Sequence, residues 1–204
     1  MMIRTALLAL LAAPLALLSC SADAALRVLA CEPEWGALAQ ELGGSLVDVS
    51  VATNALQDPH QIQAKPSLIA RARNADLVVC TGAELEIGWL PVLLQQSGNA
   101  KVQPGQPGNF AAADYVRKLD VPTQLDRSQG DVHAAGNPHI QTDPRNLLKI
   151  GEALSARMAE IDPANALAYQ SGYKVFADKL RSAIATMTTT AGRHPANGVL
   201  GDRL

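Results

Sequence analysis

The segment LVDVSVATNALQDPHQIQAKPSLIARARNADLVVC, residues 46–80, carries the signals of three successive structural elements. Its first residues, 46–51, and its last, 76–80, are short runs rich in valine and leucine, as expected of strands. Between them, Pro66 stands where the first turn of a helix tolerates proline, and the helical run SLIARAR follows it. Parallel strands need a crossover connection of this length. The segment therefore predicts a strand, a helix and a second strand parallel to the first.

The sequence on both sides extends this pattern. LRVLAC (26–31) predicts an earlier strand, and WGALAQEL (35–42) has helical spacing that ends at two glycines. Residues 87–96 predict a further helix that begins or kinks at Pro91, and the Gly/Pro-rich residues 103–110 predict a loop. We expect an α/β fold, an open parallel sheet with flanking helices.

Two Asp-Pro pairs, Asp143-Pro144 and Asp162-Pro163, mark the starts of two helices in the C-terminal part. The second helix keeps a three-to-four spacing of apolar residues as far as residue 187 and is much longer than the helices before it. Residues 188–204 show no helical or strand period. We therefore expect an α/β lobe over residues 25–161, a long helix over 162–187 and an irregular tail over 188–204.

The N-terminus, residues 1–24, resembles an export signal. Arg4 precedes an apolar run, residues 6–18, and small residues ending at Ala24 follow. The run is too short for a membrane anchor, and no later segment has the roughly 20 apolar residues of a membrane helix. Cys20 offers an alternative lipoprotein site, although Leu-Leu-Ser before it fits that pattern poorly. We expect a periplasmic protein that does not span the membrane, and the net charge of −2 gives no basic surplus for nucleic acid.

Two Asx-Pro-His units, ending at His60 and His139, precede helices. In an open parallel sheet, the loops at the carboxyl ends of the strands meet at one edge, so both histidines can reach the same site. The proline before each histidine reduces the entropy lost when the ring is held in place. Two imidazoles suit a divalent transition metal, zinc above all. His133 is a weaker, auxiliary candidate, and we assign no role to His194.

Cys31 and Cys80 follow the first and third predicted strands. Thiolate ligation of a metal is one interpretation of this pair. A disulfide, or two small buried side chains, is the favoured one, because such strands are commonly neighbours in parallel sheets. The glutamates near the strand ends, Glu32, Glu34, Glu84 and Glu86, are expected at the solvated surface or as charges at helix starts, and a metal or acid/base role is the alternative.

The runs ALRVLACEPEWGALAQELGG, the segment from residue 46 to LPVLL, and GNPHIQTDPRNLLKIGEALSARMAEIDPANALAYQSGYKVFADKL together resemble the solute-binding proteins of ABC-type zinc and manganese importers. The resemblance covers about residues 26–180 and includes both Pro-His turns. It implies an N-terminal metal-binding lobe in which His60 is the first ligand and His139 the second. The helix from Pro163 would be the rigid connection between two lobes.

The family's second lobe, which supplies another histidine and a carboxylate, has no counterpart in this sequence, nor does its long histidine-rich loop. We therefore expect a zinc-binding component, with manganese as the other possible ion, that is reduced to its N-terminal lobe and works with a membrane permease rather than as an enzyme. A defective, frameshifted product is another interpretation. The alternative from a different class is a small zinc hydrolase using His60, His133 and His139 with an open water position. No HExxH helix supports it.

Overall fold

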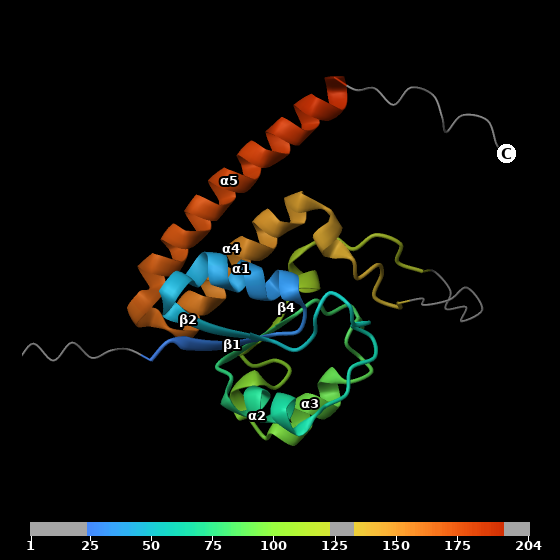
Figure 1. Cartoon of the computed structure of the whole chain (residues 1–204), viewed down its shortest axis with the longest axis vertical. Coiled ribbons are helices and arrows are strands. Elements are labelled where there is room, and N and C mark those ends of the chain that lie inside the picture. Colours follow the sequence, from blue (N-terminus) through green and yellow to red (C-terminus); the bar gives the residue numbers. More distant parts are fainter. Residues whose placement is uncertain (1–23, 123–132, 194–204) are drawn as a thin grey trace, which may run out of the picture.

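The computed structural model describes residues 24–122 and 133–193, which form a parallel sheet with helices on both faces (Figure 1). The sheet has the order β2-β1-β3-β4, and each neighbouring pair is parallel. Its strands are β1 (Leu26–Ala30), β2 (Val47–Val51), β3 (Leu77–Cys80) and β4 (Asn109–Ala111). The expected fold class, an open parallel sheet with flanking helices, is confirmed. The expected signal segment, apart from Ala24, and residues 194–204 of the expected tail lie outside the described residues.

The central strands are apolar along almost their whole length because helices cover both faces of the sheet. All four residues of β3 are buried, and in β1 only Arg27 is exposed. Arg27 lies at the amino-terminal side of the sheet, where its guanidinium forms an ion pair of 2.9 Å with Asp76. Hydrophobic burial thus stabilises the middle of the sheet, and the ion pair lies at its edge.

One face of the sheet is covered by α1 (Pro33–Gly43), α4 (Pro144–Ile161) and α5 (Ala166–Arg193), the layer above the strands in Figure 1. Trp35, Met158 and Tyr169 are fully buried in this layer. Helix α5 crosses α1 closely, because Gly172 lies against the carbonyl of Leu42 where a Cβ atom would collide with it. The rest of α5 runs beyond the sheet (Figure 1).

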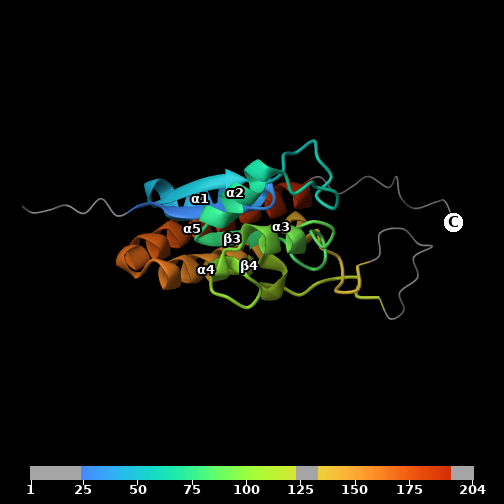
Figure 2. The same ribbon diagram turned by 90° about the horizontal axis from the view of Figure 1, so that it is seen from below.

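The opposite face is covered by the two shorter helices α2 (Pro66–Asn74) and α3 (Leu90–Ser97), which Figure 2 shows in front of the strands. Their core contains Trp89 and Leu93 together with Cys31 and Cys80. The two cysteines are joined in a disulfide with Cα atoms 4.8 Å apart, and it links the end of β3 to the residue that follows β1.

One local prediction was wrong. The segment 103–110 is not all loop, because Asn109 and Phe110 begin β4, and the amide of Val78 donates to the carbonyl of Gly108 to align it with β3. A strand of three residues is too short to show a period of two. The helix expected within residues 87–96, beginning or kinking at Pro91, begins at Leu90 with Pro91 in its first turn, after a run of turns in which Ala83 and Glu84 have positive φ.

Helix α5 continues past the expected end at residue 187 to Arg193. Thr186, Thr188 and Thr189 donate their hydroxyl groups to the carbonyls of Ser182, Ile184 and Ala185, one turn earlier. These local bonds occupy the threonine hydroxyls without interrupting the helix. No helix in the described part of the chain is long and apolar enough to span a membrane.

Candidate metal centre

The loop after β2 holds His60 in an Asx-Pro turn that orients both its backbone and its ring. Asp58 Oδ1 accepts a hydrogen bond of 2.9 Å from the His60 amide and lies 2.7 Å from the ring Nδ1. Both interactions lower the pKa of the Asp58 carboxyl below its usual value, and the hydrogen bond from the backbone amide has the larger effect. A carboxylate at Nδ1 favours the tautomer that carries the proton there, which leaves the lone pair on Nε2. The turn therefore presents a preoriented metal-ligand atom.

A second contact holds this loop against the segment that leads into α3. The indole N–H of Trp89 donates a 2.7 Å hydrogen bond to the carbonyl of Pro59, and Trp89 itself is buried. Gly88 lies so close to the His60 carbonyl that a Cβ atom there would come within 2.8 Å of the oxygen. The backbone before and at His60 is thus packed onto the body of the protein, which reduces the ordering cost of ligand capture.

His133 lies against His60. Their Nε2 atoms are 3.2 Å apart and their rings are stacked, with centroids 5.3 Å apart. Two imidazole nitrogens at 2.0–2.1 Å from a tetrahedral zinc ion would be about 3.3 Å apart. The backbone beside His133 is held by Glu84, whose carboxylate accepts from the Ala134 amide at 2.8 Å. The spacing of the two nitrogens is therefore the spacing that a shared zinc ion needs.

His139 occupies a turn of the same kind. Asn137 Oδ1 accepts a hydrogen bond of 2.9 Å from the His139 amide, as Asp58 does for His60. The sequence unit Asx-Pro-His thus forms the same kind of turn in both places. His139, however, is exposed. Among residues 24–122 and 133–193, its ring nitrogens do not join those of His60 and His133 in a group of three ligand atoms within 4.8 Å of one another. The structure brings the auxiliary candidate, His133, to His60 and leaves His139 apart from that pair.

A buried carboxyl cluster, Glu32 and Glu86, lies where β1 and β3 end, so the expectation that these glutamates lie at the surface was wrong. The two oxygens of Glu86 accept from the amides of Thr81 and Gly82 at 2.7 and 3.0 Å. The Thr81 hydroxyl accepts from the Trp35 indole and donates to Glu32 at 3.2 Å. The glutamates are 4% and 2% exposed. Burial, and then repulsion by Glu86, raises the pKa of Glu32 to about 9, and burial also raises the pKa of Glu86.

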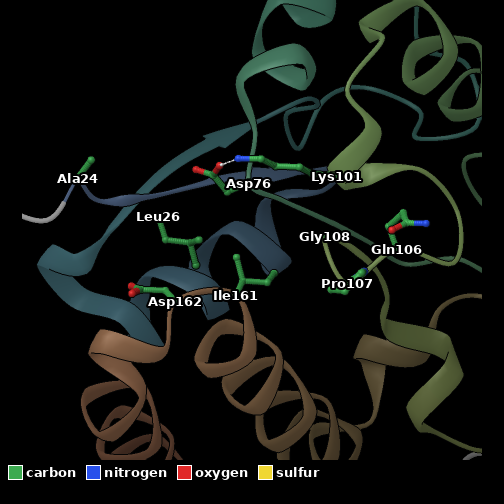
Figure 3. A pocket seen from close by; sticks show the side chains of 9 residues that line it. All are labelled: Ala24, Leu26, Asp76, Lys101, Gln106, Pro107, Gly108, Ile161 and Asp162. Carbon is green, nitrogen blue, oxygen red and sulfur yellow. Dashed lines mark hydrogen bonds and ion pairs between the residues drawn. The ribbon is translucent and has the colours of Figure 1, made fainter.

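A hollow of about 490 Å³ opens at the opposite edge, between the amino ends of the strands and the end of α4 (Figure 3). Asp76 is the carboxylate nearest the strands, and Arg27 and Lys101 both form ion pairs with it. Although burial opposes the effect, their hydrogen bonds lower the pKa of Asp76 to about 2. The Asp76 carboxylate is thus already paired with two basic side chains, and no histidine of the described residues lines the hollow.

Comparison with known proteins gives one family match over most of the chain. The model of a family described as "ZnuA: Zinc-uptake complex component A periplasmic" matches residues 28–200. The metal ABC transporter substrate-binding lipoprotein ScbA of Streptococcus cristatus is 24% identical over 76% of this chain and 48% of its own length. The iron-binding protein YfeA of Yersinia pestis is 26% identical over 78% of this chain and 47% of its own.

Solved structures show the same fold. A manganese-bound periplasmic metal binding protein from Candidatus Liberibacter asiaticus superposes with a TM-score of 0.64 at 23% identity, over 80% of this chain and 56% of that one. A crystal structure titled ZnuA gives 0.63 at 23% identity, over 78% of this chain and 55% of that one. The chain thus spans about half the length of the relatives it matches. Several of those relatives are named lipoproteins, so their names do not support the preference for ordinary signal cleavage.

Proposed function

Because this chain belongs to the family of periplasmic zinc-uptake components, which are solute-binding proteins and not enzymes, we propose that it is an extracytoplasmic zinc-binding component of an ABC importer. Its described residues would form the N-terminal, metal-binding lobe, and α5 would be the helix that leads to a second lobe. A membrane permease would be the partner that receives the ion. Family membership argues against the zinc hydrolase interpretation, in which the same histidines held a catalytic metal.

The observation that carries this proposal is the contact between His60 and His133. Nε2 of His60 is oriented by Asp58 and lies 3.2 Å from Nε2 of His133, close to the separation expected of two ligands on one zinc ion. His139 is the remaining candidate, since its turn repeats the geometry of the His60 turn. We propose His60 as the primary ligand, with His133 and His139 as the other imidazoles of this lobe.

Zinc is the proposed cargo because the donors are nitrogens. Imidazole suits zinc, whereas manganese and other harder ions favour carboxylate and carbonyl oxygen. Relatives are named for iron and for manganese, so the family alone leaves the ion open. Solvent or a second lobe would fill the remaining coordination positions, and release would require only ligand exchange, with no bond chemistry.

Calorimetric zinc titration of the chain and of single histidine variants tests the proposal. A four-ligand structural zinc site contributes about 10–16 kcal/mol. The two imidazoles in contact, His60 and His133, are half of such a set, so they should bind with roughly 5–8 kcal/mol, a Kd on the order of micromolar or weaker. His139, which lies apart from the pair, should add less. His60→Ala should abolish most binding, and His133→Ala and His139→Ala should each weaken it. His194→Ala is the matched control and should bind like the parent chain. Unchanged binding in His60→Ala would refute the proposal, and nanomolar binding would show a more complete site than these histidines form.

A further inference from the structure

Cys31, Cys80 and Glu86 place two sulfurs and a carboxylate oxygen within 4.8 Å of one another. Among the described residues they form a group with the composition of a metal site, and it is separate from the histidines. All three residues are buried, with 1%, 3% and 2% of their surface exposed. In the structure the two sulfurs are bonded to each other, so they cannot act as thiolate ligands in this state.

The surroundings of this group favour a cation. No lysine, arginine or histidine in the described part of the chain forms an ion pair with Glu86 or with its buried neighbour Glu32. Moreover, Glu32 Oε1 is buried and has no hydrogen-bond partner. Buried carboxyl groups are normally paired or bound to metal. A dication beside Glu86 and the two sulfurs would therefore displace no basic side chain of the described residues.

Glu86 is already held as a metal ligand would be. Its oxygens accept hydrogen bonds from the amides of Thr81 and Gly82, which fix the carboxylate beside Cys80. Glu32 is connected to the same place through the Thr81 hydroxyl. Such outer hydrogen bonds are what orient carboxylate ligands in metal sites.

We infer that Cys31, Cys80 and Glu86 form a second, redox-gated zinc site, which becomes available when the disulfide is reduced. A dithiol reductant supplies two electrons and two protons, so the disulfide becomes two thiols while the dithiol becomes a disulfide. Zinc then binds both sulfurs and releases the two thiol protons to solvent. A water molecule takes the fourth position.

The required movement is small. On a tetrahedral zinc ion with Zn–S of about 2.3 Å and Zn–O of about 2.0–2.2 Å, two sulfurs lie about 3.8 Å apart and a sulfur and an oxygen about 3.6 Å apart. The present group is already within 4.8 Å, so side-chain rotation after reduction suffices. The site is independent of the histidines proposed for cargo binding, because none of them belongs to the group.

Cobalt absorption tests this inference, because thiolate ligands give Co²⁺ a near-ultraviolet charge-transfer band that imidazole ligands do not. A Cys20→Ala chain, in which only these two cysteines remain, is reduced with dithiothreitol, desalted without oxygen and checked for native circular dichroism before Co²⁺ is added. One equivalent should produce the band, the unreduced chain should not, and zinc should remove the band by displacing cobalt. Glu86→Gln in the same background should bind Co²⁺ at least about 10-fold more weakly.

Two further variants separate this site from others. Glu152→Gln, on the exposed face of α4, is the matched carboxylate control and should behave as the parent. His60→Ala should keep the band, which makes the result independent of the cargo site. A reduced, folded chain without the band overturns the inference. So does a band of equal strength in Glu86→Gln, or one that forms only after the helical signal has been lost.

Discussion

Replacing Glu32 by glutamine should change how the stability of the protein depends on pH. In the folded chain, burial and the charge of Glu86 raise the pKa of Glu32 from its ordinary value of 4.5 to about 9. The native state therefore holds a proton on Glu32 at neutral pH that the unfolded chain has released. A raised carboxyl pKa contributes stability that is fully present below pH 4.5 and is lost as the pH rises toward 9.

The size of the effect follows from the pH interval. Each pH unit between the two pKa values costs the wild type about 1.4 kcal/mol of unfolding free energy from this one group. Between pH 5.5 and 8 the wild type should lose on the order of 3 kcal/mol relative to Glu32→Gln, which carries no titrating group there. Glutamine has nearly the same shape as a protonated glutamate and can keep the contact to Thr81.

Urea unfolding of the two proteins at pH 5.5 and pH 8 measures this difference directly. Glu152→Gln, on the exposed face of α4 and away from the buried carboxyl cluster, is the matched control and should follow the wild type at both pH values. If the unfolding free energies of the wild type and Glu32→Gln change by the same amount between pH 5.5 and pH 8, Glu32 is ionised in the folded protein. The pKa assigned to the buried carboxyl cluster would then be wrong.

Asp58→Ala should weaken zinc binding about 10–100-fold, because it removes the acceptor at His60 Nδ1 and the turn oxygen together. Asp58→Asn should lose less, since Asn137 already performs the turn function at His139, and calorimetry showing equal affinity in all three proteins would remove the positioning role of Asp58. Thiol titration of a denatured, unreduced Cys20→Ala chain, expressed with export, should find no free thiol, and reduction should release two. Two thiols before reduction would contradict the Cys31–Cys80 disulfide.

Much of the fold could be predicted from local patterns. The β-branched runs of β1, β2 and β3 and the proline at the start of α2 are strong signals, because burial on both faces requires apolar strands. Strand β4 could not be found, since its pairing with β3 is a long-range contact of three residues. The end of α5 was missed because its threonines are satisfied by hydrogen bonds to the preceding turn, which apolar spacing does not reveal.

Of the candidate site, only the two turns that carry His60 and His139 could be predicted from the sequence. Asx-Pro-His is a local unit, and the hydrogen bonds at His60 and His139 show why it recurs. His60 and His133 are 73 residues apart in the sequence, and no local sequence pattern predicts a contact between residues so far apart. Glu32 and Glu86 were misjudged for a similar reason. A glutamate near a strand end is normally solvated, and only the packed structure shows the amides and the hydroxyl that donate hydrogen bonds to these two carboxyl groups in the interior.

X-ray absorption spectroscopy at the zinc edge of the unreduced, zinc-loaded chain tests the central claim most directly, because it reports the atoms bound to the ion. Imidazole binding at the carboxyl edge of the sheet predicts a first shell of nitrogen and oxygen at about 2.0–2.1 Å, with the outer-shell scattering of at least two imidazole rings, reduced in His60→Ala. A first shell without imidazole scattering, or one containing sulfur at about 2.3 Å in the unreduced chain, would contradict the account.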